Sequence, residues 1–494
     1  MRKSMTAERF AQLSRFADAD YLISILLGLL FVALCVPVLS FELIQQKNYH
    51  KIISITVIVT LIALAACFYI YHYQNRIIRN HARAASLVGL FILLLTVTKM
   101  GSLLTGRTHW ATGTAVMASV ILIIAYDQRF AIGMSIFYAV LACFTAEAMI
   151  NTRLFLIMAA GIMTCCFSLR EIRTRMKLLE VSTLAAAIVF IVAFASGLLT
   201  DKELSELFYD AGWHAGFTFL AGLLIQSLLP IIEKIFRIAT SMTLLDYSDA
   251  NQPLLKRLAM EAPGTFSHSL LVGSIAEAAA EAIGRNGLLC RVGAYYHDIG
   301  KINKPTYFVE NEMGLTSRHK ELSPAMSQLV IIGHVKDGVE MAKEYGLPVV
   351  LRQFIETHHG TTLIEYFYNE AKKKQDEKQS VPSESEFRYA GPKPRTKEAA
   401  IVMLADAMES AVRSLPEVTP TKIETIVHNM VMKRLQDGQF DECDLSLREL
   451  NKIETSMSKT LAAHHHGRIA YPTPPQPDEQ TETQSESEQN KKPD

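Results

Sequence analysis

Long apolar runs dominate the first half of the chain, whereas the second half mixes apolar and charged residues. Up to about residue 233 the apolar runs are separated only by short polar stretches. Beyond that point charged residues become frequent and apolar positions recur at helical spacing. The pattern predicts a polytopic α-helical membrane domain followed by a second domain that is almost entirely α-helical.

The first half contains about eight segments that could each cross a bilayer, since a spanning helix needs roughly 20 mostly apolar residues. The segments are 21–40, 51–72, 85–105, 110–126, 130–150, 154–169, 180–199 and 214–233. The first is retained as an anchor, because its apolar run is long and no small-residue cleavage site follows it. We therefore expect a membrane domain over residues 21–233.

Basic residues concentrate in alternate loops between these segments, and this sets the expected orientation. They are Arg2, Lys3, Arg9 and Arg15 before the first segment, Arg76, Arg79 and Arg83 after the second, Arg170, Arg173, Arg175 and Lys177 after the sixth, and Lys234 and Arg237 after the eighth. The loop after the seventh, "TDKELSELFYD", is acidic. Because cytoplasmic loops are enriched in Lys and Arg, we expect residues 1–20 and the whole second half to be cytoplasmic, with the chain in the inner (plasma) membrane.

Charge and cysteine usage exclude several other classes of protein. The 49 basic residues are balanced by 49 acidic ones, so the chain lacks the positive excess of a DNA or RNA binder, and no such partner is expected. The cysteines form no CxxC pair, which argues against a disulfide framework or a cysteine-based zinc site. Transport through the membrane domain is a weaker hypothesis: Glu147 and Gln226 are polar, but no charged constellation typical of a carrier accompanies them.

The second half divides into a connector, a helical core and a polar tail. Residues 234–262 read as short connecting helices, and 263–470 as the core domain. Within the core, "AKKKQDEKQSVPSESE" is so poor in apolar residues that we expect a mobile loop there. Residues 471–494 have the composition of a disordered tail.

Histidines and acids recur along the core domain in a pattern that suits metal chemistry. They are His268, His297, Asp298, His334, His358, His359 and Asp406. Imidazole and carboxylate groups suit divalent ions such as manganese, iron or zinc. Two ions about 3.5–4 Å apart, bridged by a carboxylate, would use all seven groups and could hold a hydroxide for attack on phosphorus. A lone histidine on an apolar helix face is more often a core residue, so spacing alone leaves the dimetal hypothesis at about even odds.

The ordered set H…HD…H…HH…D, with "HDIGK" at its centre, resembles the HD phosphohydrolase superfamily. More specifically, the chain resembles the seven-transmembrane HD family of cyclic di-AMP phosphodiesterases, the PgpH type. The segments that carry this resemblance are "LLKRLAMEAPGTFSHSLLVGSIAEAAAEAIG", "RVGAYYHDIGKINKP", "LSPAMSQLVIIGHVKDGVEMAKEYGLP", "HHGTTLIEYFY", "FRYAGPKPRTKEAAIVMLADAMESAVRSL" and "DGQFDECDLSLREL". The resemblance covers the second half nearly end to end, and the first half by its architecture.

The resemblance implies two bound transition-metal ions, with manganese or iron expected. His268, His297 and Asp406 would hold one ion, His334, His358 and His359 the other, and Asp298 would bridge both. Lys301 would act in catalysis by bringing positive charge to the phosphate or by lowering the pKa of a bridging water, with Gly300 permitting a tight exit from the doublet. Residues that could contact phosphate, ribose or base are Lys304, Asn311, His319, Thr361, Thr362 and Arg413, for each of which an ordinary structural role is about as well supported.

Two features separate this chain from the family pattern. Family members commonly carry a large extracytoplasmic domain after the first span, whereas here only "FELIQQKNYH" separates the first two spans. The glycine-tyrosine-proline signature of cyclic di-GMP-cleaving relatives is missing after His359, where the chain reads "GTTLIEYFY". This difference favours the adenine dinucleotide as substrate.

The expected function is therefore a membrane-anchored, metal-dependent phosphodiesterase that hydrolyses cyclic di-AMP to linear pApA. One alternative keeps the metal site but takes cyclic di-GMP or another nucleotide. A second alternative is a non-catalytic membrane receptor that binds a nucleotide and signals to a partner. The regulatory input and the oligomeric state, including a homodimer, stay open at this point.

Overall fold

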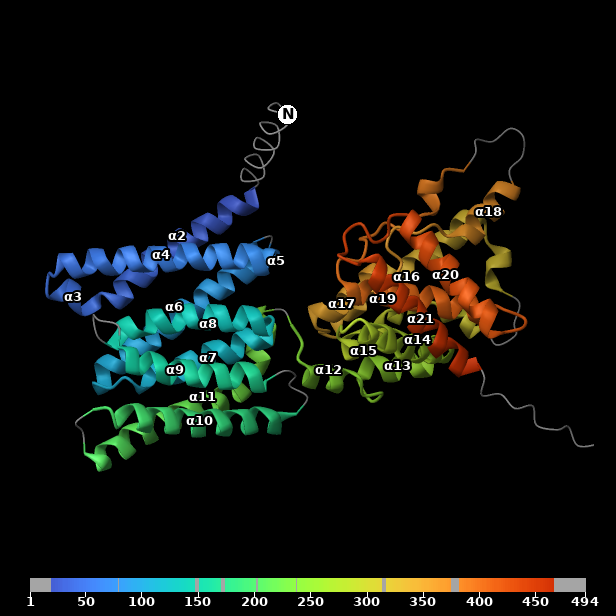
Figure 1. Cartoon of the computed structure of the whole chain (residues 1–494). Helices are drawn as coiled ribbons and strands as arrows, with labels where there is room; N and C mark the ends of the chain where they lie inside the picture. The colour runs from blue at the N-terminus through green and yellow to red at the C-terminus, as the bar shows by residue number, and fades with distance from the viewer. Residues whose placement is uncertain are drawn as a thin grey trace, which may run out of the picture.

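The chain forms two helical bundles that lie end to end in the computed structural model (Figure 1). The structure describes residues 19–78, 80–146, 151–169, 174–200, 203–236, 238–312, 317–374 and 382–465. Several sequence predictions fall outside these ranges: the tail 471–494, Glu147, part of the loop expected around 371–386, and the basic residues Arg2, Lys3, Arg9, Arg15, Arg79, Arg170, Arg173 and Arg237.

Within the described residues, the N-terminal bundle consists of eight long helices and two short ones. The long helices are α2 (Ala19–Leu39), α4 (Tyr49–Tyr73), α6 (His81–Thr105), α7 (His109–Ala125), α8 (Gln128–Ala146), α9 (Thr152–Ser168), α10 (Arg175–Gly197) and α11 (Leu204–Phe236). The short ones are α3 (Phe41–Gln45) and α5 (Asn75–Ile78). Each long helix coincides with one of the eight apolar segments predicted from the sequence.

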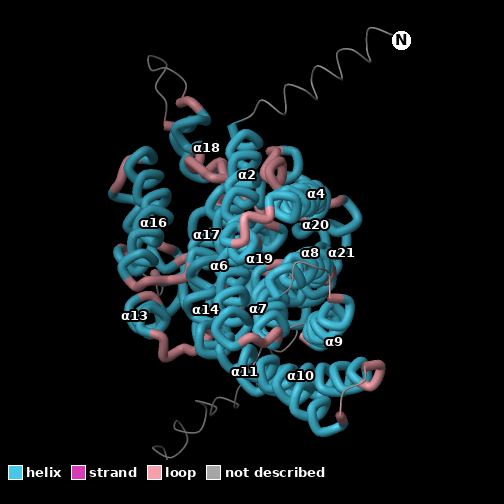
Figure 2. Tube along the Cα trace, turned by 90° about the vertical axis from the view of Figure 1, so that its left-hand side faces the viewer, coloured by secondary structure: helices cyan, strands magenta, loops and turns pink. Residues whose placement is uncertain are grey.

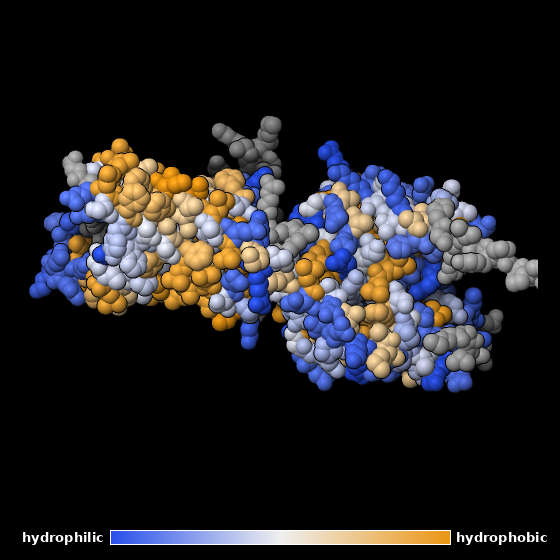
Figure 3. Space-filling view, turned by 90° about the horizontal axis from the view of Figure 1, so that it is seen from below, coloured by the Kyte–Doolittle hydropathy of each residue, from blue (hydrophilic) through white to orange (hydrophobic). Residues whose placement is uncertain are grey.

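Six of these helices are long and apolar enough to cross a membrane, and α7 and α9, at 17 residues each, are shorter apolar helices. In space-filling view the N-terminal bundle carries an apolar belt with polar residues at both ends (Figure 3). Large apolar side chains such as Leu64, Phe68 and Leu104 are exposed on it. Apolar surface of this extent suits a lipid environment rather than water.

One sequence prediction about this bundle is wrong. The acidic stretch "TDKELSELFYD" was expected to be a loop, but α11 already begins at Leu204 and continues through it. The stretch is helical because its apolar residues recur at helical spacing, with Leu207 and Ala211 buried against neighbouring helices. The helix therefore starts about three turns before the apolar run that reveals it.

A buried lysine, Lys99, links three helices at the end of the bundle where α11 begins. Lys99 of α6 donates hydrogen bonds to Glu42 Oε2 of α3 at 2.8 Å and to the carbonyl of Thr145 of α8 at 3.0 Å. A charged group in such surroundings is costly unless it is paired, and here it is paired. The contacts hold three helices together at the end away from the C-terminal bundle.

The described part of the C-terminal bundle is built from ten α-helices and short 3₁₀ turns. The α-helices are α12 (Ser241–Tyr247), α13 (Pro253–Glu261), α14 (Pro263–Ala282), α15 (Gly287–Tyr296), α16 (Pro324–Glu344), α17 (Val349–Thr357), α18 (Glu365–Lys373), α19 (Lys397–Arg413), α20 (Pro420–Gln436) and α21 (Leu447–His465). The 3₁₀ turns are η1 (Ile299–Asn303), η2 (Pro305–Tyr307), η3 (Val309–Asn311), η4 (Arg318–Glu321) and η5 (Glu384–Phe387). The described residues contain no strand, as Figure 2 shows, so the predicted all-α class is confirmed for both bundles.

Two helices give the C-terminal bundle its centre. Helix α15 takes part in two apolar cores: Cys290 and Ala294 pack with α14 and α19, while Val292 and Tyr296 pack with α13 and α17. Helix α19 is buried over most of its length. Residues on these helices are consequently held by packing on several sides, which makes them rigid supports for a site.

The contact between α15 and α17 depends on a glycine. A Cβ atom at Gly293 would lie 2.5 Å from the ring of Phe354, which is fully buried. We expect Gly293→Ala to destabilise the fold by about 1–3 kcal/mol through overpacking. In thermal unfolding of the purified protein, the transition of the C-terminal bundle should move down by several degrees.

Gly333→Ala in α16 is the matched control, because nothing lies within 4 Å of its Cβ position. Removing a glycine from a helix interior should leave stability unchanged or raise it by up to about 1 kcal/mol. Equal losses in the two variants would show that the Phe354 contact does not explain the effect.

Candidate metal centre

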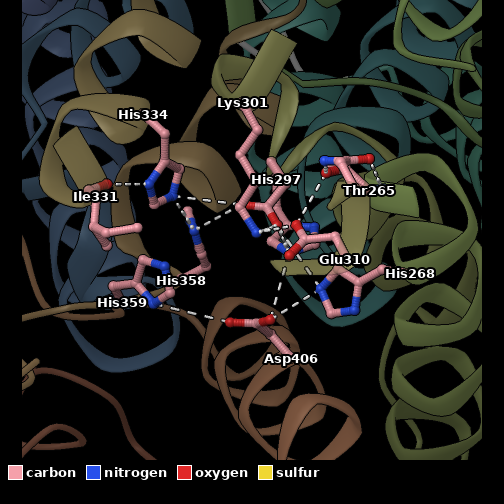
Figure 4. A network of polar contacts seen from close by, with 12 residues as sticks. Thr265, His268, His297, Lys301, Glu310, Ile331, His334, His358, His359 and Asp406 are labelled. Carbon is pink, nitrogen blue, oxygen red and sulfur yellow. Dashed lines mark hydrogen bonds and ion pairs between the residues drawn. The ribbon is translucent and has the colours of Figure 1, made fainter. Parts of the chain in front are cut away.

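The seven predicted ligand residues converge on the middle of the C-terminal bundle, from five helices (Figure 4). His268, His334 and Asp406 lie within α14, α16 and α19. The two doublets occupy helix ends: His297 and Asp298 directly follow α15, and His358 and His359 directly follow α17. A helix end lets two adjacent side chains turn toward one point, which a continuous helix would direct about 100° apart.

The seven residues form two groups that share Asp298. One group is His268, His297, Asp298 and Asp406, the other is Asp298, His334, His358 and His359, and in each group the ligand atoms lie within 4.8 Å of one another. This is the division that the family resemblance implies, with the same shared carboxylate. Their roles as metal ligands stay a prediction.

Distances within the groups match what a shared ion requires. In the first group, His268 Nε2 lies 3.1 Å from Asp406 Oδ1, and His297 Nε2 lies 3.3 Å from Asp298 Oδ2. In the second, the Nε2 atoms of His334 and His358 are 3.1 Å apart and lie 3.4 and 3.5 Å from Asp298 Oδ1. Bonds of about 2.0–2.1 Å place neighbouring ligands of one ion about 3.0–3.4 Å apart. Each oxygen of Asp298 therefore faces a different group.

Four of the five histidines donate a hydrogen bond from Nδ1, and this bond decides which nitrogen faces the site. The acceptors are the carbonyl of Ala294 for His297 at 2.6 Å, that of Ile331 for His334 at 2.5 Å, that of Ile355 for His358 at 3.0 Å, and Glu409 Oε2 for His268 at 2.5 Å. Because carbonyl and carboxylate oxygens only accept, Nδ1 carries the proton and Nε2 presents its lone pair to the centre. Outer contacts of this kind orient histidine ligands in metal sites.

His359 is held differently from the other four. Its Nδ1 lies 3.9 Å from Asp406 Oδ2, and its side chain is 23% exposed. The ring stacks on Tyr389, with 4.2 Å between ring centroids. Stacking on Tyr389 therefore positions this ring, in place of the Nδ1 hydrogen bond that positions the other four.

The charges of the described residues fit a pair of cations. Burial alone would raise the pKa of Asp298, but His297 and Lys301 outweigh it and hold the pKa of this carboxyl well below its usual value. The pKa of Asp406 is likewise held well below its usual value: burial raises it, but the nearby imidazoles of His268 and His297 outweigh that effect. Burial lowers the pKa of His334 to about 3, so its ring is neutral at pH 7 and free to bind a metal. Two buried carboxylates require positive charge beside them. His297 Nε2 has no hydrogen-bond partner within the described ranges, which also suits a metal.

Lys301 contacts the carboxylate of Asp298. Its Nζ lies 2.7 Å from Asp298 Oδ2 and 2.8 Å from Glu310 Oε1. Burial would lower the pKa of Lys301, but the carboxylates of Asp298 and Glu310 outweigh it and raise the pKa above its usual value. The lysine is therefore a fixed positive charge beside the centre. Glu310 is itself held by Thr265 Oγ1, which donates to Glu310 Oε1 at 3.0 Å.

Gly300 is needed for close packing against α16, and not for the tight turn expected from the sequence. A Cβ atom there would lie 1.9 Å from the carbonyl oxygen of His334 and 2.5 Å from the nitrogen of Gly338. Its backbone φ is not positive, so the local conformation does not itself require a glycine. The glycine lets η1 pack directly on α16, which brings Asp298 and His334 together, rather than permitting an unusual turn.

Most of the six predicted substrate contacts have structural partners within the fold. Asn311 Nδ2 donates to Thr265 Oγ1 at 2.9 Å, and His319 Nε2 donates to the carbonyl of Tyr307 at 2.8 Å. Arg413 lies 3.4 Å from Glu409 Oε1. Lys304 is exposed, and its ammonium has no ion-pair partner within the described part of the chain.

Thr361 and Thr362 belong to a second layer behind His359. The backbone nitrogen of Thr361 donates to Gln439 Oε1 at 3.0 Å, and the hydroxyl of the buried Thr362 donates to the carbonyl of His359 at 2.8 Å. Thr362 also accepts a hydrogen bond from the nitrogen of Tyr389 at 3.0 Å. These contacts hold Tyr389 against His359.

Sequence reasoning missed three residues that support the centre: Glu310, Tyr389 and Glu409. Glu409 lies three positions after Asp406 on α19, so both carboxylates face the same side of one helix. That spacing was a usable signal. Glu310 and Tyr389 gave none, because their positions depend on irregular segments that bring them to the site from elsewhere in the fold.

Glu409 is predicted to be a positioning residue for His268. Removing its carboxylate in Glu409→Ala frees the imidazole to rotate, so metal affinity should fall about 10–100-fold. Glu409→Gln keeps an oxygen acceptor and should recover much of the affinity. Titration of the metal-free protein with Mn²⁺ measures both, and an Ala variant that binds as tightly as the wild type would contradict the role.

Comparisons with known proteins agree with this architecture. Residues 49–240 match the family model described as a 7TM receptor with intracellular HD hydrolase, and residues 265–411 match the HD domain model. The first range holds seven of the eight long helices, α4 and α6 to α11, and α2 precedes it. The second range contains all seven residues of the candidate metal centre.

Two curated relatives extend the similarity over most of the chain. It is 37% identical over 441 residues to the cyclic-di-AMP phosphodiesterase PgpH of Bacillus subtilis, which covers 87% of this chain and 61% of the relative. It is 35% identical over 428 residues to PgpH of Listeria monocytogenes, which covers 83% of this chain and 58% of the relative. The chain thus spans about three fifths of the length of these relatives.

A crystal structure of the L. monocytogenes PgpH HD domain is 45% identical in sequence, covering 44% of this chain and 100% of that one, with a TM-score of 0.42. The two family matches lie in the same order as the two bundles, and the curated relatives share more than a third of the aligned residues. The chain is a membrane protein that resembles, in both of its bundles, the family of seven-transmembrane receptors with an intracellular HD hydrolase domain.

Proposed function

We propose that this protein is a membrane-anchored phosphodiesterase that hydrolyses cyclic di-AMP to linear pApA with the help of two metal ions. The observation that carries the proposal is the pair of ligand groups that share Asp298. A carboxylate with one oxygen directed at each group suits a bridge between two ions, and two-ion centres favour in-line displacement at phosphorus. A module that only binds a nucleotide has little need of such a centre.

The substrate follows from the relatives and from the sequence after the histidine doublet. Both curated relatives are named cyclic-di-AMP phosphodiesterases. The chain reads "GTTLIEYFY" after His359, without the signature expected for cyclic di-GMP. Hydrolysis adds water across one phosphodiester: a new bond forms between phosphorus and the water oxygen, the bond to the 3′ oxygen breaks, and that oxygen takes a proton. The product is a linear dinucleotide with a 5′ phosphate.

The donor set favours manganese or iron in the centre. Five imidazoles, two carboxylates and no thiolate suit ions of intermediate softness. His268, His297 and Asp406 would hold one ion and His334, His358 and His359 the other, with Asp298 between them. When bound, such ions would polarise a phosphate oxygen and lower the pKa of water.

The protein itself supplies fixed charge and orientation. Lys301 holds its ammonium against Asp298 and within reach of the centre, where negative charge develops during the reaction. Tyr389 and the Nδ1 hydrogen bonds keep the imidazoles in place before substrate arrives. Among the predicted substrate contacts, the exposed Lys304 suits a phosphate best, whereas the partners of Asn311, Thr361, Thr362 and Arg413 suit a role in shaping the pocket.

The proposal places the C-terminal bundle in the cytoplasm, where cyclic dinucleotide messengers act. The supporting observation is the concentration of basic residues in alternate loops. In this arrangement residues 234–262, which contain α12 and α13, connect a membrane domain at 21–233 to an HD domain at 263–470. All seven ligand residues come from one chain, so the centre needs no second subunit, and a homodimer stays open.

Activity of the purified full chain tests the proposal. With Mn²⁺ and cyclic di-AMP we expect pApA as product, slower turnover of cyclic di-GMP, and loss of activity on metal chelation. Asp298→Ala removes the bridge and should lower kcat by at least about 100-fold. Absence of linear product from protein that demonstrably binds two ions would overturn the proposal, and faster cleavage of cyclic di-GMP would change the substrate.

Lys301→Met tests the role of the fixed positive charge. The substitution keeps the length of the side chain and removes its charge, so kcat should fall roughly 100-fold or more while both ions remain bound. Lys336→Met is the control, because Lys336 is exposed two residues after His334 in α16. If both variants lose the same modest activity, or if Lys301→Met loses its metals instead, the electrostatic role of Lys301 is wrong.

A further inference from the structure

A second group of ligand-type side chains lies in the N-terminal bundle, far from the candidate metal centre. It consists of His109, the first residue of α7, together with Asp210 and His214, which lie one turn apart on α11. Both helices begin at the end of the bundle away from the C-terminal bundle (Figure 1). The ligand atoms of the three residues lie within 4.8 Å of one another.

His109 is buried, and its ring nitrogens are unpaired among the described residues. Its side chain is 4% exposed, and neither ring nitrogen has a hydrogen-bond partner in the described part of the chain. Asp210 Oδ1 lies 4.0 Å from His109 Nδ1, which is too far for a hydrogen bond. The ring contacts Trp213, His214 and Phe217. A buried imidazole without a partner is costly, and a metal ion beside it would satisfy it.

The other two residues are oriented as ligands are. His214 Nδ1 and Thr112 Oγ1 are hydrogen bonded at 2.7 Å, which leaves His214 Nε2 free to face the group. Arg153 at the start of α9 holds Asp210 Oδ2 at 2.7 Å, which leaves Oδ1 on the side of His109. Each residue is thus fixed through one atom and presents another, the arrangement that outer contacts give to metal ligands.

We propose that His109, Asp210 and His214 bind a divalent transition-metal ion of the zinc class. Two imidazoles and one carboxylate are a donor set that zinc accepts, with a fourth position left for water. Magnesium and calcium are disfavoured because they prefer oxygen ligands. The ion would join α7 to the second and third turns of α11, the helix that continues from this site to Phe236 next to the C-terminal bundle.

The metal content of the purified full chain tests the proposal. Metal-free wild type and the double variant His109→Ala/His214→Ala are dialysed against micromolar Zn²⁺, and bound zinc is counted by mass spectrometry. We expect the double variant to bind one ion fewer per chain. This difference does not depend on how many ions the C-terminal bundle takes, because that bundle is unchanged, so the outcome is separate from that of the proposed function.

Two further variants make the experiment decisive. His50→Ala removes an exposed histidine near the start of α4, at the same end of the bundle, and should leave the zinc count unchanged. Thr112→Val keeps all three ligands but removes the contact to His214, so zinc should bind about 10–100-fold more weakly at this site. Equal counts in wild type and double variant would overturn the proposal, as would an equal loss in His50→Ala. If the double variant does not fold, an unchanged affinity in Thr112→Val would overturn it.

Discussion

The centre of the C-terminal bundle depends on one buried carboxylate that two groups of ligands share. Asp298 is almost fully buried, and its two oxygens face different sets of imidazoles. Such a charge is stable only if cations or hydrogen-bond donors surround it. The packing of α15 between two cores and the close contact of η1 with α16 place this carboxylate. The ammonium of Lys301 helps to neutralise its charge.

Much of this arrangement could be predicted from the sequence, for identifiable reasons. Apolar runs revealed all eight long helices of the N-terminal bundle, because lipid-exposed helices need continuous apolar sequence. The order of histidines and acids revealed the ligand set through its family resemblance. Spacing alone did not, since His268 and Asp406 meet although they lie 138 positions apart in the sequence.

Some residues near the two candidate sites could not be placed from the sequence. Their positions depend on where helices begin and on the course of irregular segments. His109 and Asp210 lay outside the predicted apolar segments, because those segments started later than α7 and α11 do. Once these helices are extended, Asp210 and His214 share a face and His109 reaches them. Tyr389 and Glu310 reach the candidate metal centre from irregular or 3₁₀ segments, whose course no periodic pattern reports. The Nδ1 hydrogen bonds of His297 and His358 likewise depend on helix ends, which sequence reasoning places only approximately.

The most direct test of the account is a crystallographic one, because the central claim is a position in space. Crystals of the Mn²⁺-loaded protein, measured at the manganese absorption edge, would locate the ions by their anomalous scattering. The account predicts two peaks about 3.5–4 Å apart, on opposite sides of the Asp298 carboxylate, one among the ligands His268, His297 and Asp406 and one among His334, His358 and His359. A single peak, or two peaks that do not flank Asp298, would contradict it.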